Sequence, residues 1–299
     1  MSFMFKYIHI EFNVMNRFFV FLFLLFFPLC VLAQAEWEPP NTVYICIDGL
    51  SRTTLYSLLK KDKLPNIKRV IASGNYRNVD VDGYKSETLP TYKVLLSGYR
   101  QGSVGLPIEK GLSIFEKLES EVPSISVMAL FSHPQNLDAQ VTINTLLTKE
   151  NIEKYVLHKE VNRSAHIVAR KAVNYIFSKR SPFFIFLNFT EVDYVGHRFR
   201  NGSERYSKAV LECDRAIGKI FDSLVENGLD DKTNIFLTTN YGFKYNARSH
   251  ENIRHSFLAS NLKIRYKGNQ EDIVPTIYHT YKIPYKNILP KLPGKALVY

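Results

Sequence analysis

The sequence is poor in cysteine and tryptophan, with three and one among its 299 residues. Three cysteines cannot form the disulfide framework that holds many small secreted domains together. The chain also lacks an internal repeat, a low-complexity block and a cluster of Lys and Arg of the kind that binds nucleic acid. A disulfide scaffold and a repeat protein are therefore excluded, and we expect no specific nucleic-acid partner.

The amino-terminal residues differ in character from the rest. After Arg17 an apolar run leads to Ala33-Gln34-Ala35, and this order of basic, apolar and small residues is typical of a secretory signal peptide. We therefore predict that residues 1–35 are a signal peptide and that the mature protein is secreted or extracytoplasmic, without a stable membrane span. The alternative is an uncleaved segment that anchors the chain in a membrane. A start at Met15 would leave residues 1–14 untranslated.

Residues 36–299 have the charge and apolar content of a globular protein. Without residues 1–35 the chain keeps 37 Lys and Arg against 27 Asp and Glu, a net charge of +10. A basic surface attracts anions, phosphate esters among them. Cys46 and Cys213 lie in apolar segments, and we expect them to be buried thiols.

Apolar runs alternate with helical patterns along residues 36–299. We predict strands at 41–49, 124–131, 182–190, 233–239 and 254–260, and the main helices at 51–61, 163–180, 203–228 and 271–283. Strands that are apolar on both faces and separated by helices indicate a parallel sheet covered on both sides. We therefore predict one α/β domain over 36–299, with a mostly parallel central sheet and helices on both faces. Ligands of such sheets bind beyond the carboxyl ends of the strands.

Chemically active residue types follow several predicted strands. Asp48 follows the first strand, Asp193 and His197 follow the third across a turn that contains glycine, and His250 lies in a later loop. Asp and His are the ligand types that hold zinc. Thr88 precedes Pro90 and a short helix, and its hydroxyl needs a base or a metal to become a nucleophile. Each residue alone is usually a cap, surface or core residue, and their joint placement at strand ends is what favours a site.

Five segments, in order, resemble the alkaline phosphatase superfamily, and more closely its type I phosphodiesterase/nucleotide pyrophosphatase branch. They are "VYICIDGLSRTTL", "KSETLPTYKVLLSGYRQGSVG", "NFTEVDYVGH", "AVLECDRAIGKIFDSL" and "EDIVPTIYHTYKIP". The resemblance implies an alkaline-phosphatase-like core and two divalent cations, usually zinc. It implies that Thr88 is the nucleophile and that Asp48 binds the first cation. It further implies that Asp193, His197 and His250 bind the second, with His255 as the alternative to His250.

The stretch "NIFLTTNYGF" departs from this resemblance. It carries Asn240-Tyr241 where the family has an Asp-His pair that binds the first cation. Asn offers a neutral oxygen and neutral Tyr is a weak ligand, so we expect a degraded first site and one bound ion rather than two. Three interpretations stay open. One is a secreted hydrolase that acts on a phosphoester or other anionic small molecule; another is an impaired homologue that binds an anionic ligand or a partner. A third is an unrelated α/β protein with accidental matches.

Overall fold

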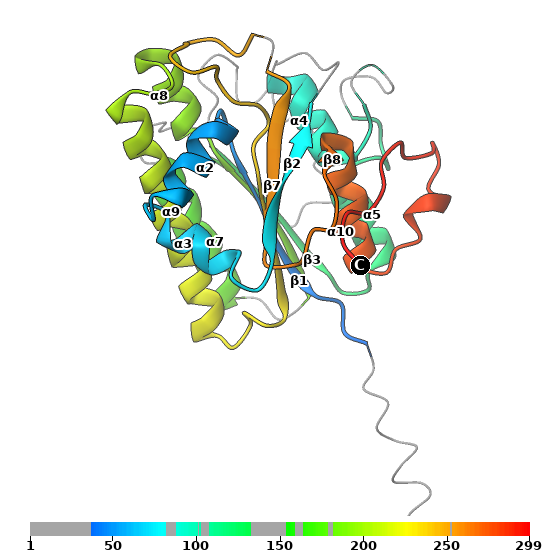
Figure 1. The fold of residues 1–299 in the computed structure, drawn as a ribbon. Coiled ribbons are helices and arrows are strands. Elements are labelled where there is room, and N and C mark those ends of the chain that lie inside the picture. Colours follow the sequence, from blue (N-terminus) through cyan, green and yellow to red (C-terminus); the bar gives the residue numbers. More distant parts are fainter. Residues whose placement is uncertain are drawn as a thin grey trace, which may run out of the picture. The chain divides into compact units, whose positions relative to one another are not determined.

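An eight-stranded sheet runs through the part of the chain from Pro39 to Tyr299 (Figure 1). The structure is a computed structural model and describes residues 37–81, 88–100, 102, 108–132, 154–158, 164–178, 182–251 and 253–299. The signal peptide predicted over residues 1–35 lies outside the described residues. None of the described helices combines the length and the hydropathy that crossing a membrane would require.

The sheet is mostly parallel, as predicted. Its strands are arranged in the order β4-β3-β5-β1-β6-β7-β2-β8, and β7 runs antiparallel to β6 and β2. In chain order they are β1 (Asn41–Ile47), β2 (Asn75–Asp80), β3 (Ser126–Ser132), β4 (Lys154–His158), β5 (Phe183–Phe189), β6 (Thr233–Thr238), β7 (His255–Ser260) and β8 (Gly268–Asn269).

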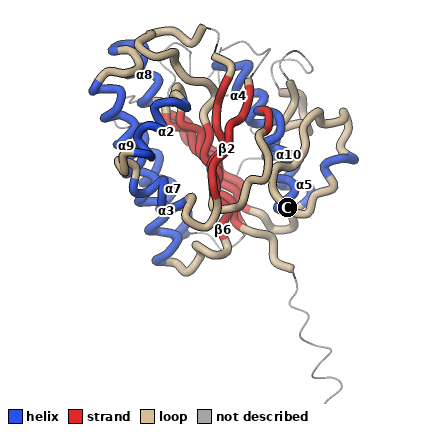
Figure 2. The backbone as a smooth tube through the Cα atoms, in the orientation of Figure 1, coloured by secondary structure: helices blue, strands red, loops and turns tan. Residues whose placement is uncertain are grey.

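Helices cover both faces of the sheet, which lies between them in Figure 2. One face carries α2 (Arg52–Lys60), α3 (Pro65–Val70), α7 (Ser164–Ser178), α8 (Glu191–Phe199) and α9 (Glu204–Glu226). The other carries α4 (Thr88–Ser97), α5 (Ile114–Glu121) and α10 (Ile273–Thr280), with the 3-10 turns Gln270–Asp272 and Tyr285–Asn287 nearby. The predicted α/β fold with helices on both faces is therefore confirmed.

The central strands are buried on both sides, which explains their continuous apolar sequences. In β1 every residue is buried; Val43 and Ile45 pack with the α7–α9 side, whereas Tyr44 and Cys46 pack with the α4–α10 side. Each fully buried large apolar side chain contributes roughly 1.5–3 kcal/mol relative to exposure. The thiols of Cys46 and Cys213 are free and buried, as the sequence predicts.

The long helix α9 follows from its capping residue and its apolar spacing. Ser203 caps it by accepting a hydrogen bond from the N–H of Tyr206. Its buried residues recur three to four positions apart, so one face packs inward. Asp214 on that face accepts hydrogen bonds from the N–H groups of Asn66 and Ile67 and thereby satisfies the amino end of α3.

The structure differs from the sequence predictions in three respects. The segment 191–197, predicted as a turn, is the first part of helix α8. The strands β2, β4 and β8 and the helices α3 and α5 were not predicted, and β2 carries mixed polar residues because it lies near the edge of the sheet. The last predicted strand, β7, is antiparallel, which its apolar sequence could not indicate.

Candidate metal centre

The carboxyl ends of three adjacent strands bring the predicted site residues to one edge of the sheet. The strands β5, β1 and β6 are neighbours and parallel. Asp48 follows β1, helix α8 follows β5, and Asn240 lies two residues after β6. Because parallel strands end at the same edge, residues that are far apart in sequence meet there.

Three of the predicted ligands converge on one point. Asp193 and His197 lie one turn apart on α8, so their side chains share a helix face. The Oδ1 atom of Asp193 is 3.6 Å from Nε2 of His197 and 3.1 Å from Nε2 of His250. The two Nε2 atoms are 2.9 Å apart. Among the described residues, this is the group of His, Cys, Asp or Glu side chains that is arranged to hold a metal ion.

The hydrogen bonds of the two histidines define which nitrogen faces the centre of the group. Nδ1 of His197 lies 2.8 Å from the carbonyl oxygen of Arg248, and Nδ1 of His250 lies 2.9 Å from that of Gly242. A carbonyl oxygen only accepts, so each Nδ1 carries the proton. In a neutral imidazole, Nε2 then presents a lone pair.

A divalent cation fits this arrangement of acceptors. Oδ1 of Asp193 is buried and has no hydrogen-bond partner, and two nitrogen lone pairs face it. Three acceptors without a donor repel one another, whereas a cation at about 2.0–2.2 Å from each atom would satisfy all three. The backbone carbonyls that hold Nδ1 orient the rings for this purpose.

Close packing fixes the positions of the three side chains. Gly49 has a φ of +70°, and a Cβ atom added to it would lie 2.7 Å from the Cα atom of Asp193. Only glycine allows α8 to come this near to the end of β1. The ring of Phe243 lies 4.0 Å from that of His250 and 5.2 Å from that of His197, centroid to centroid. The centre is therefore walled by apolar groups on one side.

The residues at the expected first cation site bond to the backbone and to one another. Oδ1 of Asn240 accepts hydrogen bonds from the N–H groups of Gly49 (3.1 Å) and Tyr241 (2.7 Å), so it is already engaged by the backbone. Oδ2 of Asp48 accepts a hydrogen bond from the phenol of Tyr92 at 3.3 Å. The ring of Tyr241 is buried against that of His250.

The electrostatics around Asp48 agree with this description. Burial raises the pKa of the Asp48 carboxyl well above its ordinary value, and the charge of Asp193 raises it further. The nearby amide of Asn240 and the hydrogen bond from the phenol of Tyr92 offset part of the increase in this pKa. Oδ1 of Asp48 and Nδ2 of Asn240 are nevertheless buried without a hydrogen-bond partner among the described residues.

Two predicted residues need separate mention. Thr88 is the first residue of α4, and the position of its side chain lies outside the described part of the structure. His255, the alternative to His250, bonds through Nδ1 to Oδ1 of Asp80 at 2.9 Å and is not part of the converging group. Sequence reasoning missed Tyr92, although its position one turn after Thr88 on a helix would have placed it near the same edge.

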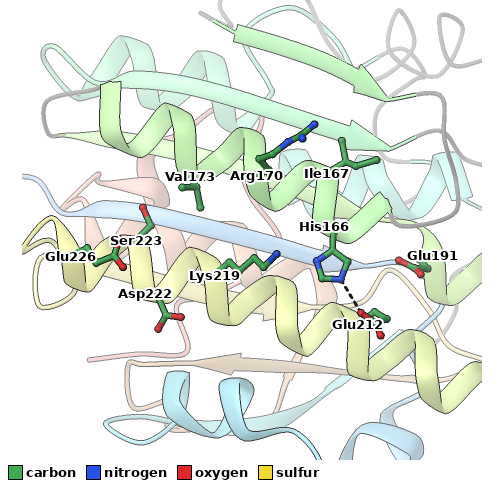
Figure 3. A pocket seen from close by; sticks show the side chains of 10 residues that line it. All are labelled: His166, Ile167, Arg170, Val173, Glu191, Glu212, Lys219, Asp222, Ser223 and Glu226. Atoms are coloured by element: carbon green, nitrogen blue, oxygen red, sulfur yellow. Dashed lines mark hydrogen bonds and ion pairs between the residues drawn. The ribbon is translucent and has the colours of Figure 1, made fainter.

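A cavity of about 1090 Å³ is lined by residues of α7 and α9 and by Glu191 of α8 (Figure 3), and none of the three converging ligands is among its lining residues. Nε2 of His166 is 2.8 Å from Glu212 there. The other lining residues mix acids and bases: Arg170, Lys219, Asp222 and Glu226. Because no third ligand completes the His166–Glu212 pair within the described residues, we regard this cavity as a groove between helices.

Comparisons with known proteins find a matching family model and solved structures that share the fold. The model described as type I phosphodiesterase / nucleotide pyrophosphatase matches residues 119–293, more than half of the chain. The match includes Asp193, His197, Asn240, Tyr241 and His250 but not Asp48 or Thr88. None of the curated proteins compared with the chain by sequence matches it.

Solved structures share the fold at low sequence identity. An alkaline phosphatase from the Antarctic bacterium TAB5 is 12% identical, with a TM-score of 0.57 over 83% of this chain and 99% of that one. A 2-O glycosaminoglycan sulfatase is 11% identical, with a TM-score of 0.63 over 87% and 73%. A protein in complex with its substrate D-glucosamine-2-N,6-O-disulfate is 11% identical, with a TM-score of 0.65 over 87% and 80%.

Proposed function

Because the chain belongs to the type I phosphodiesterase / nucleotide pyrophosphatase family, we propose that it is a secreted hydrolase of phosphoesters that uses one divalent cation. The observation that supports this most directly is the set of three acceptor atoms of Asp193, His197 and His250, which has no donor at its centre. Zinc suits two imidazoles and one carboxylate best.

The proposed role of each residue follows from its position. A bound cation would polarise a phosphoryl oxygen and neutralise charge that develops during the reaction. Asp193 and the two histidines hold and orient that ion, and Phe243 limits the access of water to it. Thr88 is the proposed nucleophile, by resemblance to the family, and its place at the amino end of α4 is where helix N–H groups favour an anion.

The proposed substrate is a phosphoester or another small anion. The net charge of +10 outside residues 1–35 favours anionic ligands. Secretion rests on the sequence pattern of those residues. One of the structural neighbours is named with a disulfated sugar as its substrate, so a sulfated compound is the chemical relative to test beside a phosphoester.

A second candidate function is supported by the hydrogen bonds at the first site. The oxygen of Asn240 is engaged by backbone N–H groups, and Asp48 is bonded to Tyr92. In this family the ion at that position ionises the nucleophile. A chain without it would be a catalytically impaired homologue that binds an anionic ligand or a partner.

Hydrolysis assays on a Thr88→Ala variant distinguish the two candidates. The wild type, supplied with zinc, is assayed with bis(p-nitrophenyl) phosphate, p-nitrophenyl phosphate and p-nitrophenyl sulfate. We expect the diester to be hydrolysed and Thr88→Ala to lower kcat by about a thousandfold or more, the usual scale for loss of a nucleophile. The control is Thr280→Ala, since the Thr280 hydroxyl bonds to the Ile277 carbonyl of α10, outside the site.

Each contrary result has a distinct meaning. If the wild type hydrolyses the diester and Thr88→Ala does so equally well, Thr88 is not the nucleophile. If the wild type binds zinc but hydrolyses none of the three compounds, the impaired homologue is the correct description.

A further inference from the structure

A second cavity, of about 370 Å³, lies next to the proposed metal centre. Gly242 and Phe243 line it, and the same two residues contact the histidines of the centre. The carbonyl of Gly242 accepts from Nδ1 of His250, and the ring of Phe243 packs against both imidazoles. The cavity and the metal centre are therefore neighbours that share the segment 242–243.

The lining of this cavity is strongly basic. Arg52, Lys244 and Arg254 all contribute to it, and no Asp or Glu is among the described residues that line it. The nearby carboxylate of Asp80 is engaged by His255 at 2.9 Å and Lys267 at 2.6 Å. Asp80 is thus paired with His255 and Lys267, and the positive charges of Arg52 and Lys244 reinforce one another in the cavity.

Neutral groups in the lining also favour an anion. Ser51 and Thr53 bring two hydroxyls, 2.8 Å apart, to the start of α2. The side chain of the N-cap residue Ser51 makes no capping hydrogen bond to this nine-residue helix, so the partial positive charge of the helix adds to that of the cations. Tyr245, 82% exposed, offers an aromatic ring at the rim.

We propose that this cavity binds a phosphate or sulfate group of the ligand, so that the substrate carries a second anionic group beside the scissile ester. The proposal rests on the proposed function in one respect only, namely that the bound ligand is a substrate. The volume lies at the lower end of the range for ligand sites, which suits one tetrahedral anion with part of the ring that bears it. Arginine and lysine bind such groups through charge-assisted hydrogen bonds.

Calorimetric titration with inorganic phosphate, repeated with inorganic sulfate, tests the proposal. The double variant Arg52→Gln/Lys244→Gln removes two cations of the cavity. The control Lys60→Gln/Lys61→Gln removes the same charge from the opposite, exposed end of α2. His197→Ala, which removes a proposed metal ligand, separates binding in the cavity from binding at the metal centre.

We expect the wild type and His197→Ala to bind phosphate with the same affinity. The cavity variant should bind it at least about tenfold more weakly, since charge-assisted hydrogen bonds are lost, and the control should change it less than twofold. Sulfate should follow the same order, because both anions are tetrahedral. Thermal unfolding of each variant shows whether it is folded. If the double variant does not fold, Arg254→Gln replaces it as the cavity variant.

Three outcomes would overturn the proposal: no phosphate binding by the wild type, equal loss in the cavity and control variants, or loss of binding in His197→Ala. The last would place the anion at the metal centre. A chain that binds no metal or hydrolyses no ester would refute the proposed function yet leave this titration interpretable, because the titration measures anion binding and neither metal content nor turnover.

Discussion

Restoring the family's Asp-His pair should make stability depend on metal. In the double variant Asn240→Asp/Tyr241→His, a second carboxylate would stand beside Asp48. That carboxyl is buried, and the charge of Asp193 already raises its pKa. The oxygen of residue 240 would still face the N–H of Gly49, but a neutral amide near Asp48 would be replaced by a second carboxylate.

The expected size of the effect follows from the burial of this group. A buried charged group without a partner costs about 1–3 kcal/mol or more. For a domain of this size, each kcal/mol corresponds to roughly 2–4 °C in Tm. In the presence of a chelator the variant should therefore unfold about 2–10 °C below the wild type. Excess zinc should remove the difference, since a ligand at a hundred times its Kd stabilises by about 2.7 kcal/mol.

Differential scanning calorimetry in chelator and in zinc provides the assay. Asn287→Asp is the matched control, because it makes the same charge change at an exposed position. If the double variant in chelator is as stable as the wild type, the hydrogen-bonded description of Asp48 and Asn240 is wrong. If zinc leaves the deficit unchanged, the restored pair does not form a cation site.

Two further predictions concern backbone geometry and pH. Gly49→Ala should lower the free energy of unfolding by more than the roughly 1–2 kcal/mol that a left-handed alanine costs. It should also weaken zinc binding, because its Cβ would lie 2.7 Å from the Cα atom of Asp193. Gly111 has a similar φ of +83° but lies in open space, so Gly111→Ala should lose only the free energy of unfolding that the left-handed backbone costs. Urea titrations measure both losses, and equal losses for Gly49→Ala and Gly111→Ala would refute the packing argument. The hydrogen bond of His166 lowers the pKa of Glu212 below its ordinary 4.5; this stabilisation is present above that pH and is lost as the pH falls through the lower, folded-state value. Glu212→Gln should therefore lower the free energy of unfolding by less than about 1 kcal/mol near neutral pH, as a partly exposed pair does. It should also flatten the loss of stability as the pH falls below 4.5, whereas an unchanged acid limb would contradict the assignment.

The sequence was sufficient for the elements whose signals are local. The strand β1 and the helix α9 were predicted because continuous apolar residues and a 3.6-residue period are visible in the sequence itself. The strands β2 and β4 were missed because one is polar in sequence and both depend on pairing with distant partners. Pairing direction is likewise a tertiary property, so β7 could be predicted as a strand but not as antiparallel.

Part of the candidate site could likewise be predicted from the sequence, and part could not. The resemblance to a known family indicated Asp193, His197 and His250, and the structure brings these side chains together. It could not indicate that the phenol of Tyr92 bonds to Asp48, because that contact joins residues 44 positions apart on separate elements. The roles of Thr88 as nucleophile and of all three ligands remain predictions for experiment.

The number of metal ions per chain tests the central claim most directly. The purified chain is loaded with zinc, freed of excess metal and measured by inductively coupled plasma mass spectrometry, beside His250→Ala. The acceptor triad of Asp193, His197 and His250 predicts one zinc per chain for the wild type and none for the variant. Two ions per chain would contradict the hydrogen-bonded first site, and none in the wild type would contradict the metal centre itself.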